Sequence, residues 1–357
     1  MKIVVLSGGI SPERDVSLSS GCMIANALAE KGHEVVMVDS FLGIEKPEAG
    51  LGSLFKKLPE YQPKTLGVPS EPPDLKRVWA ERKPDTGCNF GQNVLEICRL
   101  ADMVFVALHG MNGEDGRVQA TFDMLGIPYT GSGYLGAAIA MDKMLTKEMV
   151  KDKGVRTPAW KTFRAGSIVS EEDLRKSAEK ISEGIEAPCV IKTPTGGSSV
   201  GVYIVTDQEN VRPAVEMCLG FGPDVVVEQL IEGREFTCAV LRDRALPSVE
   251  IVPKVDFYNY ENKYKAGATE EICPGRCTPE VERQMGEMAL KVHNTLGLRT
   301  YSRSDFIVDK YGNAWFLEVN TLPGMTPTSL VPQEAAAVGI SYEDLCEIIV
   351  NDALESR

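Results

Sequence analysis

The stretch "SRSDFIVDKYGNAWFLEVNTLPGM" (302–325) constrains the fold of this chain more than any other segment. Two β-rich runs flank the turn-prone residues 310–313, which predicts an antiparallel hairpin. A four-residue loop places Asp305 directly opposite Glu318. Because strand side chains alternate, one face of the hairpin should then carry Arg303, Asp305, Ile307, Phe316, Glu318 and Asn320. A slip of one residue would send this set into the apolar face that holds Trp315, so the pattern favours this register.

Opposed carboxylates destabilise a hairpin. Asp305 and Glu318 therefore need either a raised pKa or a cation between them. Asn320, expected opposite Arg303, adds a neutral oxygen. Two carboxylates and an amide oxygen form a set of hard ligands suited to Mg²⁺ that bridges substrate phosphates. The alternative is a surface hairpin whose charges are incidental.

The length and charge of the chain limit its class. Its 357 residues exceed one compact core and predict two or three domains. The formal net charge of −13 argues against a nucleic-acid or anionic-membrane partner. No apolar run reaches membrane length, and the strand-like "KIVVLS" shows no signal-peptide pattern. The nine cysteines are scattered, which predicts reduced thiols in the cytoplasm rather than a zinc site at Cys273 and Cys277.

The order of predicted elements divides the chain into three regions. Residues 1–131 alternate strands and helices, as in a doubly wound parallel α/β sheet, with an irregular, proline-rich excursion at 41–90. Residues 132–232 open with one long helix, predicted over 134–153, and continue in an α+β pattern with hairpins. Residues 233–357 add further strands, a helix, the hairpin described above and one terminal helix.

Two segments of the middle of the chain could bind a nucleotide. "VIKTPTGGSSVGV" places Lys192 at the end of a strand, before a glycine-serine turn whose N–H groups suit a polyphosphate. A plain hairpin turn is the alternative. In "VVVEQLIEGREFT", Glu228 and Glu235 flank a crossing between regions, where a strand edge could hold a heteroaromatic base and a carboxylate could hold ribose hydroxyls. The alternative is an exposed linker with two surface glutamates.

Two segments of the first region could bind a small substrate. "ALHGMNGEDG" ends a strand with His109 and a glycine-rich acidic loop, and ligands of open α/β sheets bind at such strand ends. For His109 a capping or core role is the alternative. "SGGISPERDVS" is a glycine turn that lacks the GxGxxG pattern. Its Glu13 would repel a phosphate and could bind an ammonium group instead.

Read together, these segments resemble the D-alanine–D-alanine ligase family of the ATP-grasp superfamily. The resemblance covers nearly the whole chain apart from 41–90 and implies a three-domain ATP-grasp fold. The motifs that carry it follow the family's order and are "SGGISPERDVSLSSG" (7–21), "ALHGMNGEDG" (107–116), "PYTGSG" (128–133), "MDK" (141–143), "GGSSVG" (196–201), "EFT" (235–237), "YENKY" (260–264), "SRSDF" (302–306) and "FLEVNTLPGMTPTSLVP" (316–332).

The resemblance also implies how ATP and metal ions would be held. The residues implied for the nucleotide are Lys143 and Lys192 for the phosphates, Ser199 in the turn that closes over them, Glu228, Gln229 and Ile231 for adenine, and Glu235 for ribose. Gln229 stands where many relatives have Lys, in a contact expected through the backbone. Asp305, Glu318 and Asn320 would hold two Mg²⁺ ions, which Mn²⁺ could replace, with Glu318 bridging them.

For the amino-acid substrates the resemblance implies a second set of residues. They are Glu13 and His109 for the ammonium group of the first amino acid, Arg303 and the Gly324 N–H for the oxyanion, and Ser329 and the Leu330 N–H for the carboxylate of the second. Lys263 and Tyr264 would lie on a loop that closes over the site. Tyr264, Ser198 and Glu13 would form a hydrogen-bonded set that links three domains.

The implied reaction joins two D-alanine molecules at the expense of ATP, for peptidoglycan precursor synthesis. The first D-alanine would attack the γ-phosphate to give an acylphosphate and ADP, and the amine of the second would displace phosphate. A homodimer is a further implication. Three alternatives stay open: D-serine or, less favourably, D-lactate as acceptor; a generic carboxylate–amine ligase, which should lack the Glu13, His109 and Ser329 set; and a non-catalytic ATP-dependent protein, which should have lost Arg303 or the metal ligands.

Overall fold

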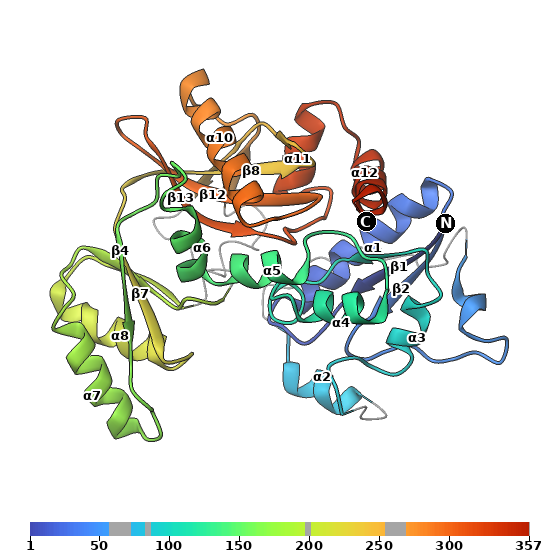
Figure 1. The fold of residues 1–357 in the computed structure, drawn as a ribbon, viewed down its shortest axis with the longest axis horizontal. Helices are drawn as coiled ribbons and strands as arrows, with labels where there is room; N and C mark the ends of the chain where they lie inside the picture. The colour runs from blue at the N-terminus through green and yellow to red at the C-terminus, as the bar shows by residue number, and fades with distance from the viewer. Residues whose placement is uncertain (57–72, 83–86, 197–200, 254–268, 357) are drawn as a thin grey trace.

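The computed structural model describes residues 1–56, 73–82, 87–196, 201–253 and 269–356. Within these ranges the chain builds three sheets with helices packed on them (Figure 1). The predicted mixture of a parallel α/β part and antiparallel α+β parts is confirmed. None of the helices in the described ranges is both long and apolar enough to cross a membrane.

The first sheet is parallel, with the strand order β2-β1-β3. Its strands are β1 (Lys2–Ser7), β2 (Glu34–Asp39) and β3 (Met103–Val106), and the helices of this region are α1 (Arg14–Glu30), η1 (Leu51–Leu54), α2 (Leu75–Glu81), α3 (Val94–Cys98) and α4 (Arg117–Leu125). The apolar run of β1 is buried from Ile3 onward, as expected for a parallel strand covered on both faces. The segment "IPYTGSG" joins this sheet through a single bridge between Val104 and Tyr129.

The second sheet is antiparallel, with the order β4-β7-β5-β6. Its elements are β4 (Trp160–Arg164), α7 (Glu171–Ser182), β5 (Cys189–Lys192), β6 (Val202–Val205), η2 (Gln208–Asn210), α8 (Val211–Leu219) and β7 (Asp224–Gln229). Apolar side chains of one face pack against α7 and α8. The opposite face carries Lys192 and Glu228. β5 and β6 pair with each other, so the glycine-serine stretch joins two strands, as the sequence indicated.

The single helix predicted over 134–153 is wrong. The segment forms two helices, α5 (Tyr134–Met141) and α6 (Lys143–Val150), which break at Asp142. Asp142 has an extended backbone, and its carboxylate accepts hydrogen bonds from the N–H groups of Met144 and Leu145, so it caps α6. The break turns α6 toward the second sheet, where the Lys143 N–H donates to the Pro194 carbonyl.

The third sheet is antiparallel in the order β11-β10-β8-β12-β13, with β9 paired to β8. Its elements are β8 (Gly233–Leu241), β9 (Arg244–Ala245), β10 (Val249–Pro253), β11 (Thr269–Ile272), α10 (Pro279–Thr295), β12 (Tyr301–Asp309) and β13 (Ala314–Asn320). One face packs against α10 through an apolar cluster that includes Phe236, Phe306 and Met285. The other face is polar and carries the candidate metal ligands.

The hairpin of β12 and β13 has the predicted partners but a different loop. Asp305 lies opposite Glu318, and Arg303 lies opposite Asn320. The loop has one residue more than predicted, because Val308 rather than Asp309 pairs with Ala314. A β-bulge between the two pairings absorbs the extra residue and restores the register.

The bulge also corrects the predicted faces of two residues. Trp315, predicted on the apolar face, pairs with Ile307, and its indole Nε1 donates to Asp309. Phe316 does not share a face with Glu318, because it pairs with Phe306 and packs against that ring in the apolar cluster, with centroids 6.0 Å apart. Asp309 pairs with Gly233 of β8 rather than with a residue of β13. Its carboxylate accepts hydrogen bonds from the Tyr311 and Asn313 N–H groups and closes the longer loop.

The chain ends in two helices, not one: α11 (Leu330–Ala337) and α12 (Tyr342–Glu355). α12 lies against α1 near the start of the chain (Figure 1). Lys31 and Asp344 form one ion pair between them, at 2.5 Å. Apolar residues of α12 belong to the same cluster as the first sheet, so the last helix completes the first core.

Candidate active site

The polar face of the third sheet brings the predicted metal ligands together. The Arg303 guanidinium binds Asp305 in bidentate fashion, with Nε to Oδ1 at 2.7 Å and Nη2 to Oδ2 at 2.9 Å. The Asn320 amide donates to Asp305 Oδ2 at 3.1 Å. Lys143 Nζ lies 3.1 Å from Glu318 Oε2. The two opposed carboxylates are therefore each matched by a cationic side chain, which removes the repulsion expected from the sequence.

Lys143 joins this face to the second sheet. Its Nζ also donates to the Gly196 carbonyl at 2.7 Å, at the start of the glycine-serine turn. A cavity of about 20 Å³ lies between these elements and is lined by Glu114, Lys143, Gly196, Glu318 and Asn320, among others. The structure thus brings a lysine, two carboxylates and an amide from distant segments to one small polar space.

The polar face of the second sheet holds a buried cluster of three charged residues. Lys192 Nζ lies 2.7 Å from Glu228 Oε1, and Lys147 Nζ lies 3.1 Å from the same oxygen. Lys147 also donates to the Thr157 hydroxyl. Burial lowers the pKa of Lys147 to about 8, although the charge of Glu228 opposes the shift. The sequence predicted Lys192 and Glu228 as site residues but missed Lys147; its position four residues after Lys143 was the available signal.

The remaining predicted nucleotide residues are placed as follows. Ile231 is half-buried, and Glu235 lies on the polar face of β8 in register with Ile307. The Gln229 N–H donates to the Ala159 carbonyl, so this N–H is already used within the protein. Ser198 and Ser199, in the glycine-serine turn, lie outside the described residues, as do Lys263 and Tyr264.

Glu13 and His109 come together beside a third group. The Glu13 carboxylate approaches Gly110 so closely that a Cβ there would lie 2.9 Å from Oε2, which explains the glycine together with its φ of 69°. His109 Nδ1 lies 2.9 Å from the Leu322 carbonyl, which only accepts, so the ring is protonated at Nδ1. Burial lowers the pKa of His109, which makes it a neutral imidazole.

Glu114 is the third group, and the sequence analysis did not single it out. It accepts from the Gly110 N–H at 2.7 Å, and burial followed by the charge of Glu13 raises its pKa. Its signal was present in the quoted motif "ALHGMNGEDG", whose acidic loop it occupies. His109 and Glu114 therefore both contact Leu322, in the loop that follows β13, and Glu13 lies beside them.

The predicted acceptor residues lie at the start of α11. Ser329 is the N-cap residue of that helix, so the Leu330 N–H that follows has no intrahelical acceptor. The Ser329 hydroxyl accepts from the Thr326 N–H at 3.0 Å, and a Cβ on Gly324 would lie 3.1 Å from it. These residues share one short turn. The same helix carries Glu334, a buried carboxylate that the sequence analysis missed.

Glu334 is bound to the third sheet behind Arg303. It accepts from the Ala239 N–H at 2.6 Å and from the Thr237 hydroxyl at 3.0 Å. Those two residues lie opposite Arg303 and Asp305 on β12. Burial raises the pKa of Glu334 to about 8. It therefore fixes the position of α11, and with it Ser329, relative to the metal-ligand face.

The candidate metal ligands fit Mg²⁺ but not a metal held by protein alone. In the described part of the chain, no three His, Cys, Asp or Glu side chains gather as ligands of one ion. Asp305 and Glu318 face each other beside Asn320 and the small polar cavity. Mg²⁺ usually keeps several waters and takes one or two carboxylates together with substrate phosphates. The donor set therefore suits an ion that arrives with a nucleotide.

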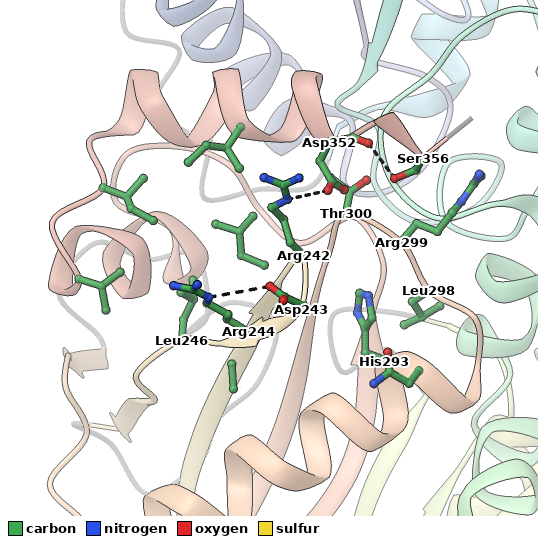
Figure 2. Close-up of a pocket in the computed structure, with 16 residues that line it drawn as sticks. Arg242, Asp243, Arg244, Leu246, His293, Leu298, Arg299, Thr300, Asp352 and Ser356 are labelled. Carbon is green, nitrogen blue, oxygen red and sulfur yellow. Dashed lines mark hydrogen bonds and ion pairs between the residues drawn. The ribbon is translucent and has the colours of Figure 1, made fainter. Parts of the chain in front are cut away.

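A large cavity in the described part of the chain lies elsewhere. Its volume is about 1000 Å³, and it opens between the β8–β9 turn and the ends of α10 and α12 (Figure 2). Its arginines are largely matched, since Arg242 pairs with Asp352 at 2.8 Å and with Glu355 at 2.5 Å. Two helix C-termini also oppose anion binding here. The cavity holds none of the residues predicted for substrate or nucleotide.

Two antiparallel sheets whose polar faces carry lysines and carboxylates toward one junction, beside a parallel α/β part, define the ATP-grasp class of ligases. Family models agree: one described as the D-ala D-ala ligase N-terminus matches residues 2–132, and one described as the D-ala D-ala ligase C-terminus matches residues 149–351. The chain belongs to the D-alanine–D-alanine ligase family.

Individual relatives cover the whole chain. The D-alanine–D-alanine ligase of Pediococcus pentosaceus is 40% identical over 98% of this chain and 97% of its own. The crystal structure of the Bacillus anthracis D-alanine–D-alanine ligase complexed with ATP matches with a TM-score of 0.72 and 28% identity, over 100% of this chain and 98% of that one. The VanG D-Ala:D-Ser ligase of Enterococcus faecalis matches with a TM-score of 0.72 at 26% identity, over 99% of both chains.

These comparisons confirm the predicted family and activity. The chain is an ATP-grasp ligase that joins two D-alanine molecules, the reaction for which the family is named. The D-serine alternative is supported only by the structural match to the VanG D-Ala:D-Ser ligase, at 26% identity. The Pediococcus pentosaceus relative, at 40% identity, is a D-alanine–D-alanine ligase.

Proposed function

We propose that ATP binds at the junction of the second and third sheets, with its phosphates between Lys143 and Lys192. The observation that carries this proposal is the convergence of these lysines with Glu228 and Glu318 from two sheets on one junction. Phosphate oxygens would replace the carboxylates and the Gly196 carbonyl as partners of the ammonium groups. A relative solved with ATP has the same fold, which supports the proposal.

We propose that Asp305, Glu318 and Asn320 hold Mg²⁺, or Mn²⁺ in its place, together with the nucleotide. A bound divalent ion would offset negative charge on the phosphates as the γ-phosphoryl group is transferred. The chain's own part is to hold this ligand set in register through the bulged hairpin. Arg303 would then exchange part of its contact with Asp305 for the oxyanion of the reacting carbonyl, with the Gly324 N–H as second donor.

The amino-acid substrates would bind on the side of the junction that faces the first sheet. Glu13 would receive the ammonium group of the donor D-alanine, beside the neutral His109. Ser329 and the Leu330 N–H would receive the carboxylate of the acceptor at the start of α11. Lys263, Tyr264 and Ser198, outside the described residues, stay predicted as parts of a closing loop and of a hydrogen-bonded set with Glu13. Ser199 stays predicted for the phosphates.

In this arrangement the donor carboxylate attacks the γ-phosphate, and the acceptor amine then displaces phosphate from the acylphosphate. An acylphosphate is readily hydrolysed, so the site must exclude water between the two steps. Glu228, Gln229, Ile231 and Glu235 would contact the nucleoside. The carboxylate of Glu228 is turned toward two lysines, so it would act on the phosphate-binding side as well.

We propose a cytoplasmic homodimer for peptidoglycan precursor synthesis, with domains divided at residues 131 and 232. All nine cysteines are free thiols, six of them buried, in keeping with a reducing compartment. The net charge of −13 supports the absence of a nucleic-acid or membrane partner.

The test is phosphate release with ATP and D-alanine, followed by mass identification of the product. The expected product with D-alanine alone is D-alanyl-D-alanine. Competition by D-serine and by D-lactate decides the acceptor. Absence of phosphate release with D-alanine, or a mixed dipeptide as the main product in equimolar D-alanine and D-serine, would refute the proposal.

A further inference from the structure

α6 carries two lysines that reach different sheets. Lys143 and Lys147 are four residues apart and therefore lie on the same side of the helix. Lys143 pairs with Glu318 on β13, and Lys147 pairs with Glu228 on β7. In Figure 1, α6 lies between the sheet of β4 and β7 and the sheet of β12 and β13. The helix thus makes one ionic contact with each side of the junction.

Glu228 is shared, and this is the unusual feature. Its Oε1 lies 2.7 Å from Lys192 Nζ and 3.1 Å from Lys147 Nζ. The side chains of Glu228 and Lys147 are 3% and 0% exposed, so water does not compensate either charge. A buried carboxylate that loses its only cation is strongly destabilised. Because Glu228 has two, one lysine can leave while the other keeps the carboxylate paired.

The two lysines differ in their freedom to leave. Lys147 is held from three sides, since it pairs with Glu228, donates to the Thr157 hydroxyl and lies over the Trp160 ring at 5.5 Å from its centroid. Lys192 ends a strand directly before the glycine-serine turn, and its described ion pair is the one with Glu228. Lys192 is therefore the one that can turn toward a ligand.

We propose that Lys147 is a positioning residue for ATP binding, which holds Glu228 so that Lys192 is released to the phosphates. This inference rests on the proposed nucleotide site. Without Lys147, movement of Lys192 to a phosphate would strand a buried carboxylate, so Lys192 would stay on Glu228. The five side chains Lys143, Lys147, Lys192, Glu228 and Glu318 carry one net positive charge, and loss of Lys147 would also cancel it.

The test is calorimetric titration of the full chain with a non-hydrolysable ATP analogue and Mg²⁺, for wild type, K147M and K147M/E228Q. We expect Kd of K147M to rise about tenfold or more, because the buried pair must be broken on binding. The single variant E228Q is titrated as well, because Glu228 would itself contact the nucleoside. The double variant should bind within about threefold of E228Q alone, since no buried carboxylate remains to be stranded. In steady-state assays of K147M, KM for ATP should rise while kcat changes less than about threefold.

Lys151→Met is the matched control. Lys151 follows α6 by one residue and pairs on the surface with Glu148 at 2.5 Å, so its loss removes the same charge without touching Glu228. The Kd of this control should equal that of wild type. A folded K147M that binds like wild type would overturn the inference, and so would a K147M change that weakens binding as much in the E228Q background as in wild type. If wild type itself does not bind the analogue, the proposed nucleotide site fails instead.

Thr157→Val keeps the inference testable if K147M does not fold. This variant preserves every charge but removes the hydroxyl that positions the Lys147 ammonium group. It should weaken analogue binding about two- to fivefold in the same direction, and it should have no further effect when it is added to E228Q. Unchanged binding in a folded T157V variant would contradict the role of Lys147.

Discussion

The two sheets that flank the junction solve the problem of buried charge in opposite ways. On the third sheet two carboxylates, Asp305 and Glu318, each have a cation of their own. On the second sheet two lysines share the single carboxylate of Glu228. The first arrangement is balanced and can accept added metal ions together with phosphates. The second has a surplus of positive charge and attracts an anion. The contrast suggests that the two sides contribute to different steps.

The carboxylates of the two sheets also differ in how deeply they are buried. The Glu318 side chain is 29% exposed, whereas that of Glu228 is 3% exposed. Coulomb interactions are weaker near water than in the interior. Changes at Glu318 should therefore act mainly on the chemistry of bound ions, and changes around Glu228 should act mainly on nucleotide affinity.

The largest effect should come from a substitution on the third sheet, where each carboxylate has a cation of its own. We expect E318Q to lower kcat at least about 100-fold, because it removes the charge that would bridge the metal ions. The fold should be retained, since Gln is nearly isosteric. Phosphate release measures the effect, and circular dichroism checks the fold. E280Q, on the exposed start of α10, is the matched control. Full activity of E318Q would refute the metal assignment.

Ser329 lies outside both ion-pair clusters, so its substitution should change neither the chemistry at the bound ions nor the nucleotide affinity. Ser329→Ala should raise the KM for acceptor D-alanine about tenfold, because a hydrogen bond to a carboxylate is lost. The KM for donor D-alanine and for ATP should change little. The measurement is initial velocity over a wide D-alanine range, fitted to two binding events. Equal shifts of both D-alanine constants would count against the assigned acceptor site.

Burial lowers the pKa of Lys147 to about 8. A change of pH should therefore alter the charge of the cluster formed by Lys147, Lys192 and Glu228. From pH 7 to 9 the charge of Lys147 is lost, so analogue affinity should fall several-fold in wild type and remain flatter in K147M. The stability of the folded protein should change in the opposite direction to the affinity. The unfolded chain holds this proton up to about pH 10.5, so the free energy of unfolding should rise between about pH 8 and 10.5. Identical pH profiles of the two proteins would exclude Lys147 as the titrating group.

The smallest effect should come from the loop between β12 and β13, which sets the register of that hairpin. Asp309 accepts hydrogen bonds from the Tyr311 and Asn313 N–H groups and from Trp315 Nε1. Burial opposes ionisation, but these bonds outweigh it and lower the pKa of Asp309 to about 2. D309N should lower Tm by roughly 2–4 °C. The exposed turn variant D243N is the control, and an unchanged Tm for D309N would show that the bulge alone fixes the register.

Residue alternation predicted the partners of this hairpin from sequence, but not how the chain achieves them. Counting back from the loop gave Asp305 opposite Glu318 through two compensating errors, an extra loop residue and a bulge. Neither can be read from alternation, because a bulge changes the period for only one residue. The same limit explains Asp142, which looked like an ordinary position within a long helical segment until the structure showed it capping a new helix.

Lys147 and Glu334 show a different limit. A lysine or glutamate on a predicted helix is normally solvent-exposed, so its burial cannot be inferred from spacing alone. Both are buried because another element reaches them, β7 for Lys147 and β8 for Glu334. Motifs identified the residues that should contact substrates. They could not identify the residues that hold those groups in place, because such contacts join segments far apart in the chain.

The packing of α12 on α1 has a consequence for how the protein is made. During synthesis the first sheet and α1 leave the ribosome long before the final helix exists, yet Leu345, Ile349 and Val350 belong to the same apolar cluster as Ile3 and Leu28. Until α12 has been synthesised, that surface stays exposed to water and to other nascent chains. A stop codon just before α12 would therefore damage the start of the molecule more than the sheets beside it.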